Sequence, residues 1–266
     1  MTEGAANARV VTRMYTPIAS DYEEIWAPLL RPYGLRLLER LAVENARRIL
    51  EIGCGVGRLL PDIAERAPSA VVVGTDLVEG MLRRAPRRFP LVVMDGSRPS
   101  FAQGAFDAAV LSFMLFHLPD PRGMLEAVRS VLRARGRIGA ATWGTGGSFP
   151  AADVFAEELD AHDAGPDAGS GGAEEQVDSP DKMEAILASA GFVEPAAEVT
   201  PWQQRWELQA FMDCRTRMGA SRRRLETLAP DVRRSCLRRI RERLATMPPE
   251  VLVDRDHVVL STARVP

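Results

Sequence analysis

The stretch ILEIGCGVGRLL, residues 49–60, carries three glycines at alternate positions directly after an apolar run. Gly53, Gly55 and Gly57 leave side chains out of a loop, so that a ligand can approach the backbone closely. An acid, Glu51, stands two residues before the first glycine. This ExGxGxG spacing predicts a strand that runs through a glycine loop into a helix and holds a cofactor there.

The residues that are absent from the loop narrow the choice of ligand. A dinucleotide fingerprint, GxGxxG, would require glycine at position 58 or 60, and these positions hold Arg58 and Leu60. A P-loop would require Gly-Lys followed by Ser or Thr, which this loop does not contain. The loop is therefore disfavoured as a phosphate cradle.

Candidate ligand-binding positions follow the next apolar runs in order. Asp76 ends VVVGTD, Asp95 follows LVVM, and Ser112 and Phe113 end the run FDAAVLSF. In an open parallel sheet, ligands bind at the carboxyl ends of the strands. Asp76 could accept both hydroxyls of a ribose, and Asp95 could receive an adenine amino group. Together these positions predict a site for an adenosine-bearing ligand.

Apolar strands alternate with helical patterns from residue 47 onward, which predicts an α/β fold with a mostly parallel sheet covered on both faces. Strands are expected at 48–52, 71–75, 91–94, 106–112 and 136–143, with two more near 196–206 and 256–264. Helices are expected at 57–67, 78–85, 121–133 and 181–190. Ser179 before Pro180 resembles a helix N-cap, and Gly191 ends that helix.

We expect one domain over residues 1–266, with helical lid insertions around a cofactor-binding core. The expected parts are a helical lid (1–45), the core (46–143), a mobile acidic lid (144–179) and a C-terminal half (180–266). Within 20–45 the pattern predicts two short helices broken near Pro32. Residues 163–173 are expected to be disordered without substrate. Residues 208–248 predict an arginine-rich helical pair, whose arginines either face solvent or form a positive rim for an anionic substrate.

Composition restricts the partners. The formal net charge of −2 argues against a nucleic-acid binder, and the longest apolar run is too short to cross a bilayer. The three cysteines (Cys54, Cys214 and Cys236) lie far apart, so neither a metal site nor a disulfide framework is expected. The N-terminus does not resemble a signal peptide, and a cytoplasmic location fits best. A homodimer is compatible with the sequence.

The segments ILEIGCGVGRL, GTD, VMDG, FDAAVLSFMLFHLPDP and LRARGRIGAATWG resemble the successive motifs of class I S-adenosylmethionine-dependent methyltransferases. The most similar group is the small-molecule methyltransferases that resemble the quinone-biosynthesis C-methyltransferases. The resemblance covers about residues 47–143. It implies a Rossmann-like, seven-stranded sheet with a reversed last strand, S-adenosylmethionine as cofactor and S-adenosylhomocysteine as product.

In that family the glycine loop packs under the methionine part of the cofactor, the acid after the second strand takes the ribose, and Leu77 would lie against the adenine. Glu51 is expected to order the loop and bind the methionine amino group. The residues predicted to hold the cofactor are Glu51, Gly53, Gly55, Gly57, Asp76, Leu77, Met81, Asp95, Gly96, Ser112 and Phe113.

The sequence does not decide which residue acts in catalysis. An oxygen nucleophile would need a base, and His117, in FHLPDP, and His162, in the acidic segment, are the candidates. Each of these histidines also has a purely structural or surface interpretation.

Aromatic side chains are the candidates for the substrate pocket. Their faces would stabilise the positive sulfonium of the cofactor, or the side chains could simply form the core. The predicted substrate pocket comprises Tyr15, Tyr22, Trp26, Phe116 and Trp143.

The predicted function is methyl transfer from S-adenosylmethionine to O, N or C of a small-molecule acceptor. RNA or protein methylation is less favoured, because SFMLF stands where an NPPY-like motif would follow the fourth strand. Two alternatives stay open at this point. The bound cofactor could serve a non-methylating reaction, or the protein could bind S-adenosylmethionine without catalysis.

Overall fold

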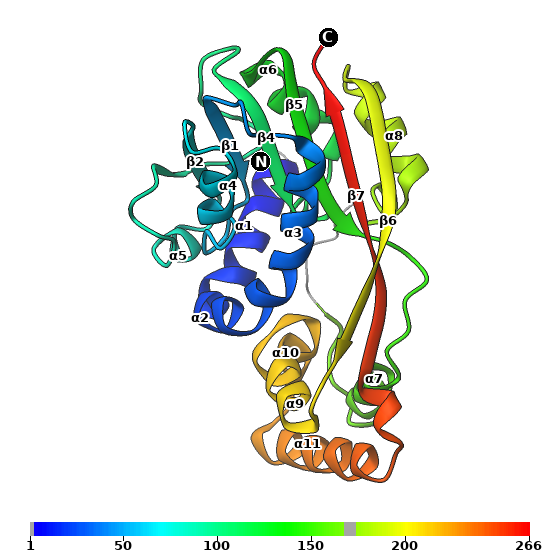
Figure 1. Ribbon diagram of the computed structural model, residues 1–266. Helices are drawn as coiled ribbons and strands as arrows, with labels where there is room; N and C mark the ends of the chain where they lie inside the picture. The colour runs from blue at the N-terminus through cyan, green and yellow to red at the C-terminus, as the bar shows by residue number, and fades with distance from the viewer. Residues whose placement is uncertain (1–2, 168–173) are drawn as a thin grey trace. The chain divides into compact units, whose positions relative to one another are not determined.

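The computed structural model describes residues 3–167 and 174–266, which separate into two compact units (Figure 1). The first unit comprises residues 1–145, 170–200 and 258–266, and the second comprises residues 146–169 and 201–257. The division of a single domain into lids, core and C-terminal half stays a prediction. Residues 168–173, part of the segment expected to be disordered, lie outside the described residues.

A seven-stranded sheet with the order β3-β2-β1-β4-β5-β7-β6 is the centre of the fold. The strands are β1 (Arg48–Ile52), β2 (Val71–Asp76), β3 (Leu91–Val93), β4 (Phe106–Ser112), β5 (Leu132–Trp143), β6 (Val193–Arg205) and β7 (Val253–Arg264). Strands β1 to β5 pair in parallel, whereas β7 pairs antiparallel to β5. The predicted α/β class and reversed last strand are therefore confirmed.

The strand order reverses between β1 and β4, which leaves a crevice at their carboxyl ends. Four of the five residues of β1 are buried, as expected for a central strand covered on both faces. Helix α3 (Ala27–Leu41) packs on β5, α4 (Leu60–Arg66) on β2 and α6 (Pro121–Val131) on β5. This packing holds the strand ends in place around the crevice.

The N-terminal segment differs from its prediction. The structure has α1 (Glu3–Tyr15), which lies in the segment predicted as helical although its bounds were not predicted, then α2 (Ala19–Asp21) and a π-helical turn, η2 (Tyr22–Trp26). Helix α3 continues through Pro32, so the predicted break there is wrong. Proline at this sixth helical position removes only one backbone hydrogen bond, near the start of the helix, and its side chain is exposed. The interruption lies upstream, at the π-helical turn.

The predicted core helices exist, but several are shorter than expected. Helix α4 begins at Leu60 rather than at residue 57, because Gly57 has a positive φ of 68° that an α-helix does not allow. Helix α5 spans only Glu79–Leu82. Helix α8 (Pro180–Ser189) has the predicted N-cap, with the Ser179 side chain accepting a hydrogen bond from the Lys182 amide. Gly191 follows this helix with a φ of 85°.

The second unit contains helices from two of the predicted segments. Part of the segment 144–179 forms α7 (Pro150–Ala161), whose Phe155 is fully buried, and its role as a mobile lid stays a prediction. The predicted helical pair consists of three helices, α9 (Leu208–Arg217), α10 (Gly219–Leu225) and α11 (Pro230–Ala245). Met218 ends α9 with extended backbone, and Gly219 follows it with a φ of 67°. These two residues break the helical pattern that the sequence reading took as continuous.

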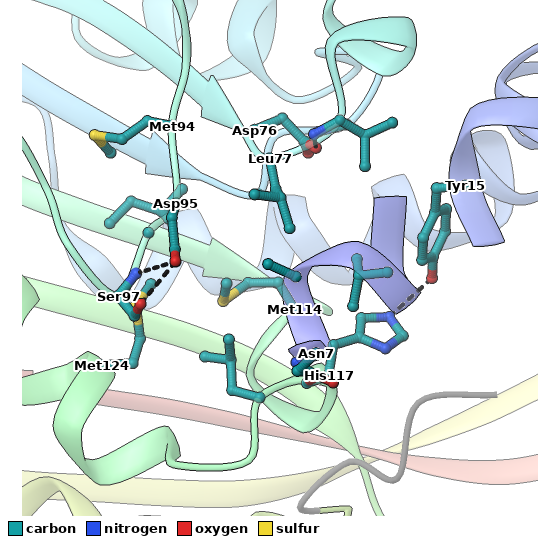
Figure 2. A pocket seen from close by; sticks show the side chains of 18 of the residues that line it. Asn7, Tyr15, Asp76, Leu77, Met94, Asp95, Ser97, Met114, His117 and Met124 are labelled. Carbon is teal, nitrogen blue, oxygen red and sulfur yellow. Dashed lines mark hydrogen bonds between the residues drawn. The ribbon is translucent and has the colours of Figure 1, made fainter. Parts of the chain in front are cut away.

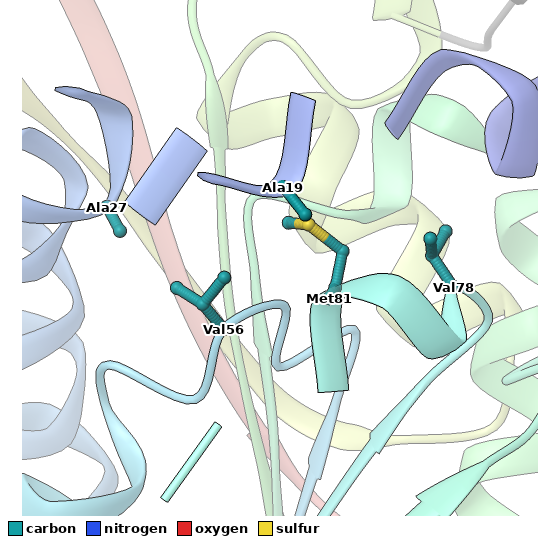
Figure 3. Close-up of a cluster of buried hydrophobic side chains, with 5 residues drawn as sticks. All are labelled: Ala19, Ala27, Val56, Val78 and Met81. Carbon is teal, nitrogen blue, oxygen red and sulfur yellow. The ribbon is translucent and has the colours of Figure 1, made fainter. Parts of the chain in front are cut away.

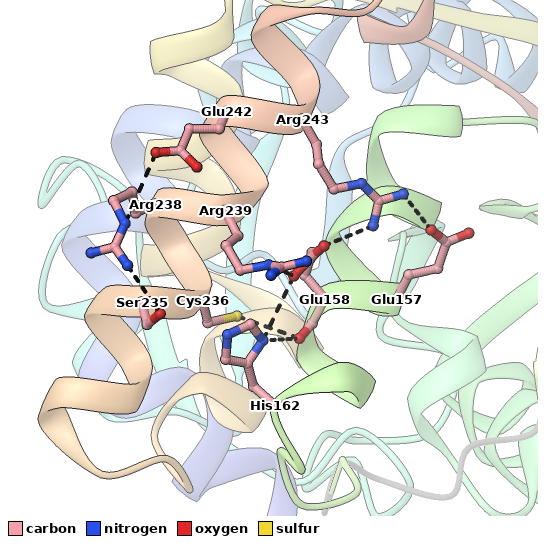
Figure 4. Close-up of polar contacts among 9 residues, drawn as sticks. All are labelled: Glu157, Glu158, His162, Ser235, Cys236, Arg238, Arg239, Glu242 and Arg243. Atoms are coloured by element: carbon pink, nitrogen blue, oxygen red, sulfur yellow. Dashed lines mark hydrogen bonds and ion pairs between the residues drawn. The ribbon is translucent and has the colours of Figure 1, made fainter.

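A buried carboxylate joins α7 to the arginines of α11 (Figure 4). Glu158 is only 2% exposed, and it accepts hydrogen bonds from Arg239 Nε at 3.1 Å and Arg243 Nη1 at 2.9 Å. Desolvation opposes ionisation of Glu158, but the bonds from Arg243 and Arg239 hold its pKa below the usual value. Arginines of α11 thus have a structural role, and a positive rim for an anionic substrate stays a prediction.

Candidate active site

The first unit contains a cavity of about 430 Å³ at the carboxyl ends of β1, β2 and β4 (Figure 2). Its volume lies within the range of small-molecule and cofactor sites. The predicted site residues that line it are Tyr15, Tyr22, Gly53, Gly55, Asp76, Leu77, Met81, Asp95, Gly96, Ser112, Phe113 and His117. Most of the predicted cofactor set is therefore brought together in one place.

The glycine loop has the backbone that only glycine adopts easily. Gly53, Gly55 and Gly57 have φ values of 69°, 56° and 68°. Gly57 is not among the cavity-lining residues; it lies where the loop meets the turn after α5. A Cβ at Gly57 would stand 2.8 Å from Ala85 Cβ and 3.0 Å from Pro86 Cδ. Gly57 therefore allows the loop to close against the rest of the unit.

Gly57→Ala is expected to displace the loop for two reasons. Alanine rarely adopts the φ of 68° that Gly57 has, and its Cβ would stand too close to Ala85 and Pro86. The left-handed backbone alone costs about 1–2 kcal/mol for a residue with a Cβ. We expect a lower melting temperature together with weaker ligand binding, measured by thermal unfolding and calorimetry. Gly104→Ala is the control, because Gly104 also has a φ of 68° but its Cβ would meet no atom closer than 3.7 Å. Equal effects of the two substitutions would contradict the closure role of Gly57.

Asp76, at the end of β2, fixes the glycine loop through hydrogen bonds to backbone amides. Its Oδ2 accepts a hydrogen bond from the Gly55 amide and its Oδ1 accepts one from the Val78 amide, both at 2.8 Å. Burial raises the pKa of Asp76, although these amide bonds oppose the shift. Each carboxylate oxygen can accept more than one hydrogen bond, so Asp76 retains capacity for ligand hydroxyls.

Asp95 forms the next part of the cavity wall. Its Oδ1 accepts hydrogen bonds from the Ser97 amide at 2.9 Å and from the Ser97 hydroxyl at 2.7 Å (Figure 2). Between them, Gly96 has space for no side chain, because a Cβ would stand 2.6 Å from Ile52 Cγ2 and 2.7 Å from Met124 Cε. The turn thus presents backbone and a fixed carboxylate to the cavity.

Glu51 lies in a small recess of about 40 Å³ that shares Tyr22, Gly53 and Ser112 with the main cavity. Its side chain is buried, and its Oε2 has no hydrogen-bond partner among the described residues. Desolvation, together with the nearby charges of Asp76 and Asp62, raises the pKa of Glu51 to about 8. A buried carboxyl without a partner is costly, so this recess suits a ligand that brings a positive hydrogen-bond donor.

Glu51→Gln is expected to stabilise the ligand-free protein, increasingly so as the pH rises. The unfolded chain ionises Glu51 above its ordinary pKa of 4.5, whereas the folded protein retains the proton up to about 8. The unfolding free energy of the wild type therefore falls across this window, by up to about 1.4 kcal/mol per pH unit. Melting temperatures of both proteins from pH 5 to 8 measure the difference. Parallel curves would contradict a buried, protonated Glu51.

Tyr15 and His117 form a hydrogen-bonded pair on the cavity wall. The Tyr15 hydroxyl lies 2.8 Å from His117 Nε2, and Asn7 Nδ2 donates to the His117 carbonyl oxygen at 2.7 Å (Figure 2). Phe116, which is buried, packs against the His117 ring at a centroid distance of 4.4 Å. It therefore supports His117 and is not among the residues that line the cavity.

An apolar cluster attaches the N-terminal segment to the glycine loop and to the turn after β2 (Figure 3). Ala19 and Ala27 from the N-terminal segment meet Val56 of the loop, and Val78 and Met81 of the turn. The rings of Tyr15 and Tyr22 pack against this cluster. Burial, with the nearby Tyr15, Asp76 and Glu51, raises the pKa of Tyr22, so its hydroxyl stays neutral.

The remaining predicted aromatic residues, Trp26 and Trp143, form a row of ring contacts with Phe113. Phe113 has a positive φ of 56°, an uncommon backbone for a bulky residue and one that occurs at functional sites. Its ring lies 5.0 Å from that of Trp143, which in turn lies 6.1 Å from that of Trp26. Trp26 and Trp143 are not among the residues that line the cavity.

His162 belongs to the second unit, where its Nδ1 lies 2.8 Å from the Glu158 carbonyl oxygen. Its role as a base stays a prediction. Of the residues of α1 that line the cavity, the sequence predicted Tyr15 and missed Gly4, Asn7, Ala8 and Val11. The four-residue spacing of positions 7, 11 and 15 is the signal that could have found them.

Metal and membrane features are not apparent in the described part of the chain. Residues 3–167 and 174–266 contain no group of three or more His, Cys, Asp or Glu that could hold a metal ion. No helix within these same ranges is long and apolar enough to cross a membrane.

Parts of the chain are similar to known methyltransferases. Residues 49–136 match the family described as "Methyltransferase domain". The chain is 32% identical over 137 residues to the aklanonic acid methyltransferase DauC of Streptomyces sp. strain C5, covering 48% of this chain and 62% of that relative. It is 33% identical over 136 residues to the demethylmenaquinone methyltransferase of Thermus thermophilus, covering 47% and 62%. The chain thus spans less than two thirds of the length of these curated relatives.

Among solved structures, a phosphoethanolamine N-methyltransferase 2 of Haemonchus contortus, in complex with phosphomonomethylethanolamine and S-adenosylhomocysteine, matches with a TM-score of 0.53. The identity is 18%, and the match covers 88% of this chain and 52% of that one, so it shows a common fold alone. With the family match and the strand order, it identifies the architecture as Rossmann-like. Residues 49–136 are therefore similar in sequence to a methyltransferase domain, and the fold agrees with that similarity.

Proposed function

We propose that the protein transfers the methyl group of S-adenosylmethionine to a small-molecule acceptor. The observation that carries the proposal is the buried Glu51 carboxyl, whose Oε2 lacks a partner next to a cavity lined by Asp76 and Asp95. One carboxyl group suits an ammonium, and the other two suit hydroxyl and amino groups. The amino acid, ribose and adenine parts of this cofactor carry these groups in that order.

The residues of the cavity fit the cofactor in the following roles. Glu51 would receive the methionine ammonium, and the backbone of Gly53 and Gly55 would pack under the methionine chain. Asp76 would accept the ribose hydroxyls, and Asp95 the adenine amino group, with Leu77 and Met81 as apolar walls. Arg58 also lines the Glu51 recess and is a candidate partner for the methionine carboxylate, a residue that the sequence reading did not select.

When bound, S-adenosylmethionine supplies an electrophilic methyl group on a positively charged sulfur. The protein's own contribution is to align the acceptor and to exclude water, which together can lower a barrier by about 7–11 kcal/mol. The face of α1 that lines the cavity and the buried ring of Phe113 provide an apolar enclosure for this purpose.

The Tyr15–His117 pair is the proposed route for the acceptor proton. With Tyr15 donating to His117 Nε2, the Tyr15 oxygen keeps lone pairs that can accept a hydrogen bond from an acceptor O–H or N–H. As the methyl group forms its bond to the acceptor atom, the acceptor proton would pass to the Tyr15 oxygen. In the same step the Tyr15 proton would pass to His117 Nε2, leaving a neutral Tyr15 phenol and an imidazolium.

Two of the curated relatives support a small molecule as the acceptor, because the aklanonic acid and demethylmenaquinone methyltransferases are named after small molecules. The test is to incubate the purified protein with S-adenosylmethionine and a library of phenols, quinols and amines. Formation of S-adenosylhomocysteine together with a methylated product is the expected result. Tight cofactor binding without any product would favour a non-catalytic binding module, and an altered acceptor without methylation would favour a non-methylating enzyme.

A further inference from the structure

The main cavity is lined by acids and by uncharged groups. Asp76, Asp95 and Asp120 line it, but within the described residues no Lys or Arg does. The chain has 34 basic residues among 266, so the exclusion of cations from 26 lining positions is not a result of scarcity. The cavity therefore offers no counter-charge for an anionic acceptor.

The arginines around the cavity are directed or paired elsewhere. Arg9 and Arg13 of α1 line a separate groove on the outer face of that helix. Arg84 forms an ion pair with Glu23, and Arg31 forms one with Asp62, each at 2.5 Å. The helical spacing of α1 thus places Asn7 and Tyr15 in the cavity and its arginines outside.

Resting on the proposed function, we propose that the lining of the cavity disfavours anionic acceptors, carboxylates and phosphates among them. An anion would lose part of its hydration next to Asp120 and would gain no ion pair from a lining Lys or Arg. An ammonium nitrogen cannot be the methylated atom, because it has no lone pair to attack the methyl group. The groups left to bind the acceptor, those of Asn7, Tyr15 and His117, recognise neutral hydroxyl and amine groups.

Asp120 is the exposed acid of this set, in the loop after His117. Its Oδ1 caps α6 by accepting a hydrogen bond from the Gly123 amide at 2.8 Å. Asparagine also caps helices well, so Asp120→Asn removes the charge while keeping the cap. Glu126→Gln is the matched control, because Glu126 is an exposed acid of the same helix that does not line the cavity.

The experiment compares three probes of nearly equal size on the full chain saturated with S-adenosylhomocysteine. The probes are 3,4-dihydroxybenzamide (uncharged), 3,4-dihydroxybenzoate (anionic) and 3,4-dihydroxybenzylamine (cationic), with affinities measured by ligand-observed NMR. The benzoate is expected to bind about tenfold more weakly than the amide, and the benzylamine is expected to bind no more weakly than the amide. Asp120→Asn should raise the affinity for the benzoate several-fold, whereas Glu126→Gln should leave that affinity unchanged.

Benzoate binding as tightly as the amide would overturn the inference, and so would equal weakening of the benzoate and the benzylamine or no binding by the amide. These outcomes are read on a protein that already holds S-adenosylhomocysteine, so they do not depend on turnover. Failure of S-adenosylhomocysteine itself to bind would instead overturn the proposed function, and this inference with it. The two failures are thus distinguishable.

Discussion

Replacement of His117 by glutamine is expected to reduce turnover by about 100-fold or more, because proton transfer by a positioned side chain contributes about 10²–10⁴-fold. Glutamine can still hydrogen-bond the Tyr15 hydroxyl, but it cannot take up its proton. Cofactor affinity should change by less than about threefold, since His117 meets Tyr15 and Asn7 rather than the predicted cofactor residues. Initial rates with the acceptor found by the library, and calorimetry with S-adenosylmethionine, measure both quantities.

Two further variants separate a proton-transfer role from a structural one. Tyr15→Phe should lose a similar factor in turnover, and the double variant should lose little more, because the two residues act as a unit. His257→Gln is the histidine control outside the cavity and should be unchanged. Full activity of Tyr15→Phe would contradict the relay.

Asp76→Ala is expected to weaken S-adenosylmethionine binding by at least about tenfold, since a charge-assisted hydrogen bond contributes about 1.5–3 kcal/mol. The substitution would remove the acceptor of the predicted ribose hydroxyls. It would also release the Gly55 and Val78 amides that Asp76 now holds at 2.8 Å. Both effects act on the same binding constant, which calorimetry measures directly.

A matched variant distinguishes lost binding from general loosening of the sheet. Asp107 also accepts two backbone hydrogen bonds, from the Arg47 and Arg48 amides at 2.6 and 2.7 Å, but it lies near the start of β4 and does not line the cavity. Asp107→Ala should therefore lower the melting temperature without changing cofactor affinity. If Asp76→Ala lowered stability alone and left the affinity unchanged, the ribose assignment would be wrong.

The cofactor half of the site could be predicted because its signals are local. Positive-φ glycines and strand-end acids such as Asp76 and Asp95 are specified by residues a few positions away, and the structure brings them to one cavity. Glu51 was expected next to the loop, but its unpartnered oxygen and its raised pKa depend on burial by the folded chain and on the charge of Asp76, 25 residues away.

The acceptor half could not be predicted in the same way. Asn7 and Tyr15 come within hydrogen-bonding distance of His117 across more than 100 residues of sequence, a contact that no local pattern reports. The Pro32 prediction failed for a related reason, since packing on β5 stabilises α3 beyond the local cost of one proline. With three histidines in the chain, the sequence alone could not choose between His117 and His162.

The central claim is that the glycine loop and its acids hold S-adenosylmethionine. The most direct test is parallel calorimetric titration of the purified protein with S-adenosylmethionine, S-adenosylhomocysteine and NAD. The account predicts micromolar binding of the first two ligands and no binding of NAD, with the affinity for the first two reduced in Asp76→Ala. Binding of NAD alone would contradict the account, because it would mean that the loop holds a dinucleotide.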